Sequence, residues 1–323
     1  MVLNIIFLVL GLVLILWGAS ALTDGASSIA RRMGVSDLIV GLTVVSFGTS
    51  APELTISIVS SLHGNAGLAV GNVVGSNIFN ICAIIGITAL VRPVGVDRSL
   101  MSNEIPLVVL SSLVLLSMGS GPWLDGAPEA VLTRVDGVLL LLFFAVFMRY
   151  VFASAKSGKP QPQADDTPAA KEMPVWKAAL LTTGGLAALI WGGDKFVDGA
   201  AAIAGAMGVS ETVIGLTIVA VGTSLPELAT SVTAALKGRT GIAVGNVIGS
   251  NIFNIFMVLG AAATVRELPF AGIGAADLLI LAGVSVMFWI SGRLFGHHVI
   301  NRLEGAAFVL IYAAYMAWVV AAA

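Results

Sequence analysis

Long blocks of hydrophobic residues, separated by short polar stretches, make up most of this chain. Apolar runs of roughly 18 residues or more recur along its whole length, and a run of that length lets an α-helix cross a bilayer. The pattern predicts ten membrane spans, near residues 2–20, 37–61, 66–90, 104–119, 135–152, 175–193, 211–235, 240–264, 273–291 and 303–321.

The one long polar stretch, 153–174, is rich in Pro, Ser, Ala and charge, which is typical of a flexible linker. Two copies of an internal repeat lie on either side of this linker. A shift of 174 residues aligns 41–80 with 215–254, and 25 of those 40 positions are identical. We therefore predict a first five-helix repeat over 1–152, a linker over 153–174 and a second five-helix repeat over 175–323.

Composition supports an all-α membrane protein. Hydrophobic residues make up 58% of the chain, charged residues 11%, and the mean hydropathy is +1.01, whereas soluble domains carry about 25% charged residues. The net charge of −2 says nothing about a nucleic-acid partner; we expect none, and no obligatory protein partner or cofactor is evident. Cys82 is the only cysteine, so an intramolecular disulfide is excluded.

The odd number of spans in each repeat has a topological consequence. The second repeat must enter the membrane from the opposite side, which predicts two inverted repeats, an architecture that recurs in transporters. With the N-terminus outside, thirteen of the 16 Lys and Arg residues fall on one side of the membrane. This bias predicts a multi-pass protein of the cell (inner or plasma) membrane, with both termini outside and the linker in the cytoplasm.

Two related segments place a proline and a glutamate together inside predicted spans. They read GTSAPEL over 48–54 and GTSLPEL over 222–228. Pro52 cannot donate a backbone hydrogen bond, so the helix should break near Gly48–Ser50 and restart at the proline. Glu53 then lies in the first turn of the new half-helix. A buried charge costs about 2.5–3.5 kcal/mol on insertion scales, so its duplication argues for a function.

The second repeat supplies the same set, because Thr223, Ser224, Pro226 and Glu227 match Thr49, Ser50, Pro52 and Glu53. If the two breaks meet at the bilayer centre, they bring together two carboxylates, four hydroxyls and freed carbonyls. An all-oxygen site of this kind suits hard cations such as Ca²⁺ or Na⁺, and it suits zinc or copper poorly.

The spans that follow carry GNVVGSNIFN over 71–80 and GNVIGSNIFN over 245–254. Glycines at intervals of four favour close helix packing; these are Gly67, Gly71, Gly75, Gly241, Gly245 and Gly249. A parallel polar row is interpreted as lining the site; it comprises Asn72, Ser76, Asn80, Asn246, Ser250 and Asn254. Asn77 and Asn251 lie off that row, and we expect them to pack against it or brace it.

The remaining polar residues suggest less. Asp24 and Asp198 match across the repeat, and we read both as helix-end residues. The chain has no metal-binding His pair and no Ser–His arrangement within spans, which argues against an intramembrane hydrolase and predicts that the protein is not an enzyme.

At the two doubled motifs the sequence resembles the cation/calcium exchanger superfamily, in particular its prokaryotic sodium/calcium exchanger type. The resemblance implies four cation positions between spans 2, 3, 7 and 8, with Glu53 and Glu227 as central calcium ligands. It adds the carbonyls of Thr49 and Thr223 to the calcium site, and assigns Ser50, Ser76, Ser224, Ser250 and the backbone of Ser46 and Ala220 to sodium. Asn80 and Asn254 would border the centre. Some relatives have Asp at one of these last two positions, so the resemblance predicts only two membrane carboxylates here.

These inferences predict a secondary antiporter that exchanges Ca²⁺ for Na⁺ by alternating access. Spans 1 and 6, which lack proline, would slide as a gate across a rigid core. A Ca²⁺/H⁺ antiporter with the same Glu53 and Glu227 site is the alternative, since protons could equally neutralise both glutamates.

Overall fold

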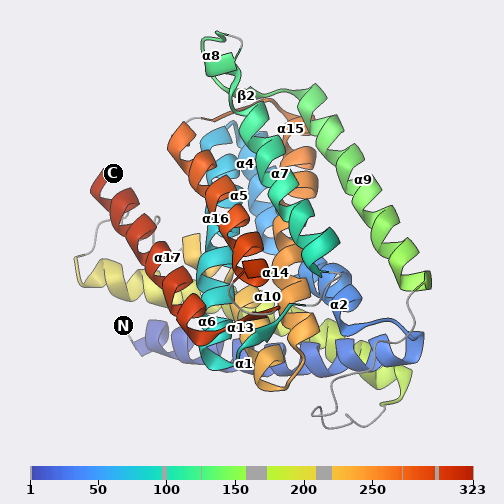
Figure 1. Cartoon of the computed structure of the whole chain (residues 1–323). Helices are drawn as coiled ribbons and strands as arrows, with labels where there is room; N and C mark the ends of the chain where they lie inside the picture. The colour runs from blue at the N-terminus through green and yellow to red at the C-terminus, as the bar shows by residue number, and fades with distance from the viewer. Residues whose placement is uncertain are drawn as a thin grey trace.

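A computed structural model describes residues 2–96, 100–124, 126–157, 173–208, 220–270, 272–294 and 298–322. Over these residues the chain is built almost entirely from helices (Figure 1). The first half contains α1 (Val2–Met33), α2 (Asp37–Val40), η1 (Gly41–Val45), α3 (Ser46–Thr49), α4 (Ala51–His63), α5 (Ala66–Phe79), η2 (Asn80–Ile84), α6 (Ile85–Val91), η3 (Leu100–Glu104), α7 (Ile105–Met118), α8 (Gly121–Leu124) and α9 (Arg134–Ser157), where η marks a π-helix.

The second half follows a similar order. It contains α10 (Val175–Ala206), α12 (Ala220–Gly222), α13 (Leu225–Leu236), α14 (Thr240–Phe253), η5 (Asn254–Leu259), α15 (Gly260–Val265), α16 (Ala275–Leu294) and α17 (Arg302–Ala322). Two short antiparallel ribbons join the halves: β1 (Val94–Gly95) pairs with β4 (Val299–Ile300), and β2 (Val131–Leu132) pairs with β3 (Leu268–Pro269).

Eight of the described helices are long and apolar enough to cross a membrane, and there are nine such spans if the bent pair Asp37–Thr49 and Ala51–His63 is taken as one. The predicted span 211–235 begins within 209–219, which lie outside the described residues. Ten spans therefore stay a prediction. The first part of the predicted linker is helical, because α9 continues to Ser157. Residues 158–172 lie outside the described residues.

The first span of each half is longer than predicted. Helix α1 runs on to Met33 and α10 to Ala206, where hydropathy had placed the ends at 20 and 193. Asp24 and Asp198 are therefore inside helices, and their interpretation as helix-end residues was wrong. Polar side chains in these extensions are hydrogen-bonded; the Thr23 hydroxyl, for example, donates to the Ala19 carbonyl at 2.7 Å. The helix can therefore continue beyond the last apolar run.

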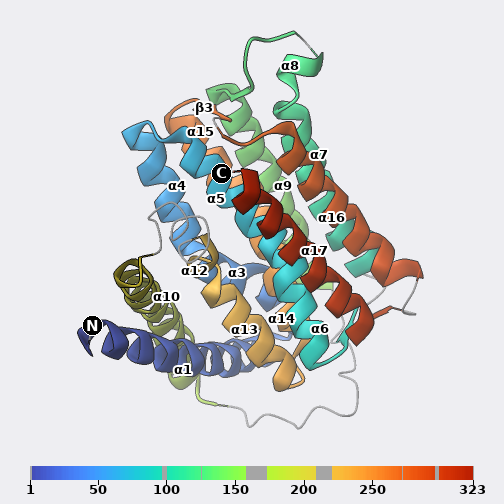
Figure 2. The ribbon, with the colours of Figure 1, turned by 90° about the vertical axis from the view of Figure 1, so that its left-hand side faces the viewer.

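Glycines bring α1 and α10 into backbone contact. A Cβ added to Gly18 would lie 2.7 Å from the Gly185 carbonyl oxygen, and one added to Gly11 would lie 2.6 Å from that of Gly192. The residue numbers run in opposite directions along this contact, so the two helices are antiparallel. The spacing of seven recurs at Gly25 and Gly199. In both views the pair lies across the lower end of the other helices (Figures 1 and 2).

Two spans form the centre of the bundle. In Ala66–Val91 and Thr240–Val265, 83% and 94% of the most apolar window is buried inside the protein, against 17% and 11% for α9 and α17. The GSNIFN motifs lie in these two central spans, at the ends of α5 and α14. The polar residues of the motifs are therefore surrounded by protein and not by lipid.

Candidate cation site

The helix break predicted before Pro52 is present. Helix α3 ends at Thr49, Ser50 has φ −85° and ψ 10°, and α4 begins at Ala51 with the proline in its first turn. The two segments bend by 45°. The proline ring clashes with a continuing helix and removes one donor, so the chain turns at Ser50 and restarts.

The second repeat breaks in the same way. Ser224, with φ −93° and ψ 9°, precedes α13, whose first turn holds Pro226 and Glu227. Helix α12 ends at Gly222 just before the break. The two glutamates therefore occupy equivalent places, each one residue after a proline that starts a half-helix.

The two carboxylates are buried and are held by hydroxyls from the opposite repeat. The Ser224 hydroxyl donates to Glu53 Oε1 at 3.1 Å, and the Ser50 hydroxyl donates to Glu227 Oε1 at 2.8 Å. Ser250 of α14 adds a longer bond of 3.4 Å to the same oxygen of Glu227. Glu53 is 0% exposed and Glu227 is 1% exposed. The cross-bonds bring both breaks to one place, as the duplicated motifs predict.

Four asparagines connect the two central spans. The Asn254 amide donates to Asn77 Oδ1 at 3.1 Å, and the Asn80 amide donates to Asn251 Oδ1 at 3.4 Å. Asn77 also donates to the Asn251 carbonyl oxygen at 3.1 Å. The bracing role predicted for Asn77 and Asn251 is confirmed. Only the amide nitrogens of Asn80 and Asn254 take part in these bonds. Their Oδ1 atoms therefore remain available as ligands.

Asn72 and Asn246 hold the half-helices and do not simply line the site. Each amide donates to the carbonyl oxygen of the glutamate in its own repeat, Glu53 at 3.4 Å and Glu227 at 3.2 Å. In addition, the Thr49 hydroxyl donates to Asn246 Oδ1 at 3.1 Å. The polar row was interpreted as one lining surface, and its first member in each repeat instead fixes the start of the broken helix.

Five buried oxygens of the predicted site have no hydrogen-bond partner among the residues that the structure describes. They are Glu53 Oε2, Glu227 Oε2, Ser76 Oγ, Asn80 Oδ1 and Asn254 Oδ1. Buried polar atoms without partners are costly, and carboxylate oxygens most of all. All five are of the oxygen type that Ca²⁺ and Na⁺ accept as ligands. Within the described ranges no group of three or more His, Cys, Asp or Glu gathers, so a cation here relies on two carboxylates with neutral oxygens.

The other predicted site residues lie around this centre. Ser46 and Thr49 are buried in α3, and their hydroxyls donate to backbone carbonyls at 3.4 Å, those of Thr43 and Ser46 respectively. Thr223 is half-buried at the break before α13. Ala220 is the first residue of α12. Helix α4 packs against η5, which begins at Asn254, and α13 packs against η2, which begins at Asn80.

The glycine prediction holds for one repeat. Added Cβ atoms on Gly245 and Gly249 would lie 2.6 Å and 2.8 Å from the carbonyl oxygens of Leu38 and Leu42, so α14 lies against α2 and η1. Gly71 and Gly75 have no such backbone neighbour among the described residues. The matching partner segment would fall in 209–219, outside them.

Two features of the structure were not predicted from the sequence. The helices widen into π-turns at Asn80 and Asn254, and such turns occur often at functional sites. Glu104 is a third buried carboxylate, 4% exposed, which accepts a hydrogen bond of 2.6 Å from the Tyr150 hydroxyl. The expectation of only two membrane carboxylates was therefore wrong, although Glu104 lies on η3 and not on a broken helix.

Comparison with known proteins agrees with this geometry. The family model described as "Sodium/calcium exchanger protein" matches residues 3–153 and 177–321. The putative antiporter CaxA of Alkalimonas amylolytica is 39% identical over 96% of each chain. The sodium/calcium exchanger MaX1 of Methanosarcina acetivorans is 32% identical over 97% of each chain. A solved structure of the sodium-calcium exchanger NCX_Mj superposes with a TM-score of 0.83 at 33% identity, covering 98% of this chain and 99% of that one.

A bundle of membrane helices around a buried, duplicated oxygen site defines a membrane transporter of the cation/Ca²⁺ antiporter class. The chain belongs to the sodium/calcium exchanger family.

Proposed function

We propose that the chain exchanges Ca²⁺ for Na⁺ across the membrane by alternating access, with Glu53 and Glu227 as the central calcium ligands. In this proposal Ser50, Ser76, Ser224 and Ser250 contribute to sodium binding together with the backbone of Ser46 and Ala220. The carbonyls of Thr49 and Thr223 support the calcium site, and Asn80 and Asn254 border it. The ten spans, the inverted repeats and the cytoplasmic linker belong to the same proposal.

The observation that carries the proposal is the set of five unpartnered buried oxygens, two of them carboxylate oxygens. Two carboxylates neutralise one divalent ion, and their second oxygens with the amide oxygens approach the coordination number of about six that calcium accepts. A bound cation removes the electrostatic cost of two acids inside the membrane. The relatives named sodium/calcium exchangers support sodium as the other ion.

Exchange follows from competition for these ligands. If calcium and sodium cannot occupy the two glutamates together, the carrier crosses mainly when one of them is loaded, since the empty site leaves two uncompensated buried charges. Each crossing with one ion must then be followed by a return with the other.

The test uses purified protein in liposomes loaded with Na⁺ and diluted into Na⁺-free buffer that contains a calcium isotope. We expect uptake that requires the outward sodium gradient. Uptake that ignores sodium and follows an imposed proton gradient would show the Ca²⁺/H⁺ alternative instead. Glu53→Gln and Glu227→Gln should each abolish uptake, whereas Glu104→Gln, which changes a buried acid outside the site, should retain it.

A further inference from the structure

One end of the α1–α10 pair is open toward the candidate site, although the two carboxylates themselves stay buried. A cavity of about 280 Å³ lies between α10 and the broken helices, and its lining includes Ile56, Asp194, Thr223 and Pro226. The cavity thus extends along α10 at Asp194 and reaches Thr223, next to Ser224, but neither glutamate lines it. We call this the Asp194 end.

The same shift of 174 residues that relates the repeats gives the mirrored lining, where Thr49 matches Thr223, Thr230 matches Ile56 and Thr23 matches Val197. Thr23, Thr49 and Thr230 are each 0% exposed. Their counterparts at the Asp194 end, Val197, Thr223 and Ile56, are half-buried. The chain thus adopts one of two states that the repeat makes possible: open at the Asp194 end and closed at the mirrored end, which we call the Asp24 end.

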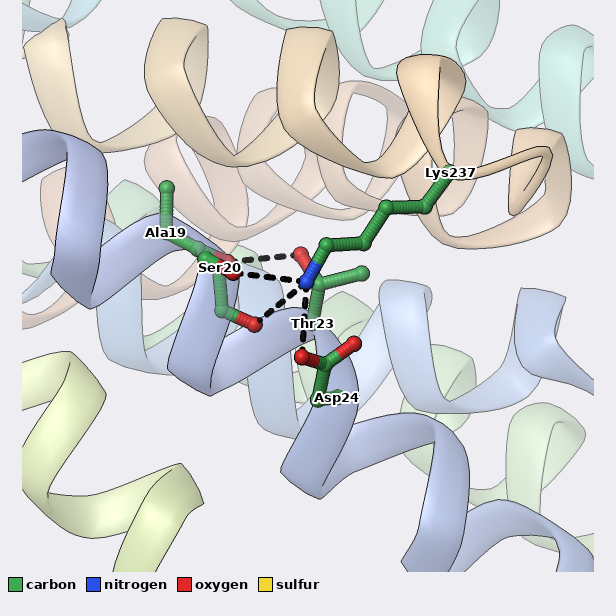
Figure 3. Close-up of polar contacts among 5 residues, drawn as sticks. All are labelled: Ala19, Ser20, Thr23, Asp24 and Lys237. Carbon is green, nitrogen blue, oxygen red and sulfur yellow. Dashed lines mark hydrogen bonds and ion pairs between the residues drawn. The ribbon is translucent and has the colours of Figure 1, made fainter. Parts of the chain in front are cut away.

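One side chain joins the core to α1 at the closed end. Lys237 follows directly after α13, and Figure 3 shows it reaching down to α1. Its ammonium donates to the Ser20 carbonyl at 3.0 Å and to the Ser20 hydroxyl at 2.7 Å, and it pairs with Asp24 at 2.7 Å. The three oxygens are contributed by a single turn of α1.

The mirrored end lacks this contact. The position that matches Lys237 is His63, whose Nδ1 lies 3.0 Å from the carbonyl oxygen of Val59 in its own helix. The position that matches Asp24 is Asp198, which pairs with Lys195 of its own helix at 2.9 Å. An ion pair within one helix cannot hold two elements together, so among the described residues the matching positions form no bridge between core and gate at the open end.

We propose that Lys237 is a latch that holds α1 against α13 and so keeps the Asp24 end closed in this state. The latch must release when the α1–α10 pair moves to open that end. An exposed pair alone contributes little, but here the ammonium also binds two oxygens of Ser20, and charge-assisted bonds are the stronger kind. The latch refines the alternating access in the proposed function, and its test does not depend on transport.

The test measures thiol labelling in detergent, where a maleimide reaches both ends of the protein. In a Cys82→Ala background, Thr230→Cys reports the closed end and Ile56→Cys reports the open cavity. We expect slow labelling at position 230 and fast labelling at position 56. Lys237→Met or Asp24→Asn should raise the rate at 230 about 10-fold and lower the rate at 56, because the two ends belong to one equilibrium. The double exchange Lys237→Asp with Asp24→Lys rebuilds the ion pair but not the bond to the Ser20 carbonyl, so it should restore the original rates only in part.

Lys195→Met is the matched control for position 230, because it removes the lysine whose ion pair stays within one helix, and it should leave the rate at 230 unchanged. Position 56 is left out of this comparison because Lys195 lines the same cavity. Unchanged rates in Lys237→Met, or an equal response to Lys195→Met, would overturn the latch. A rise at both positions would also overturn it, since that pattern indicates general loosening. If labelling responds as expected but liposomes take up no calcium, the latch stands and the proposed function fails.

Discussion

Ser50 donates a hydrogen bond of 2.8 Å to Glu227, a residue 177 positions further along the chain. Ser224 donates the reciprocal bond of 3.1 Å to Glu53. Each hydroxyl lies at the break of one half-helix and orients the carboxylate of the other. A carboxylate fixed by one oxygen keeps its second oxygen aimed at whatever binds between the two breaks.

Removing one of these hydroxyls should weaken cation binding without unfolding the protein. A hydrogen bond to a charged group contributes about 1.5–3 kcal/mol, so Ser50→Ala or Ser224→Ala should raise the calcium concentration for half-maximal uptake at least roughly 10-fold. Thr55→Ala is the control on α4, because the Thr55 hydroxyl is exposed and bonds only to Ala51 of its own helix. Equal uptake curves for Ser50→Ala and Thr55→Ala would contradict the assignment.

The asparagine bridge should matter for stability as well as for binding. Asn77→Leu leaves the Asn254 amide and the Asn251 carbonyl without their partner, and each buried unpaired group costs about 1–3 kcal/mol. We expect a lower melting temperature in detergent and weaker calcium binding. Ser291→Ala, which removes a buried hydroxyl bonded to Glu304 of α17 and not to the bridge, should affect melting alone. A variant at Asn77 with normal calcium affinity would show that the bridge is only structural.

The α1–α10 contact offers two adjacent glycines with opposite expectations. A Cβ on Gly185 would lie 2.6 Å from the Leu22 backbone nitrogen, whereas one on Gly184 would meet nothing within 4 Å. Gly185→Ala should therefore separate the two helices and reduce both melting temperature and calcium uptake. Gly184→Ala should behave like the unaltered protein in both measurements. Similar behaviour of the two variants would argue against the close backbone contact.

Calcium should stabilise the folded protein through the two glutamates. A ligand at 100 times its dissociation constant adds about 2.7 kcal/mol to the free energy of unfolding, so the melting temperature should rise as calcium is titrated. Glu227→Gln should lose that rise and keep the melting behaviour of the calcium-free protein. A calcium-dependent rise that survives in Glu227→Gln would place the binding site elsewhere.

Much of the centre could be predicted from sequence because its signals are local and doubled. Pro52 and Pro226 break helices for a steric reason that needs no knowledge of neighbours, and the glutamates beside them are too costly to be incidental. The bracing by Asn77 followed from its angular offset on a helix. These predictions depend on one residue and its few neighbours along the chain.

The features that sequence missed depend on partners far away in the chain. Helix α1 continues past Ser20 because its polar residues meet Lys237, 217 positions later. Glu104 stays buried because the Tyr150 hydroxyl bonds it from α9. A hydropathy window cannot include such partners, so it ended α1 and α10 early and overlooked one acid. The widened turns at Asn80 and Asn254 lack any composition that distinguishes them from ordinary helix.

The reciprocal bonds between Ser50, Glu227, Ser224 and Glu53 also bear on how such a chain could arise. Neither half contains a complete carboxylate shell, so a gene for one half would yield a glutamate without the serine donor that lies at the opposite break. Two copies of that half, inserted in opposite orientations side by side, would supply each other. After fusion, residues that bond across the join would be free to change only in pairs. Such a restriction would apply to 71–80 and 245–254, which agree at nine of ten positions and hold the asparagines that bond across the join.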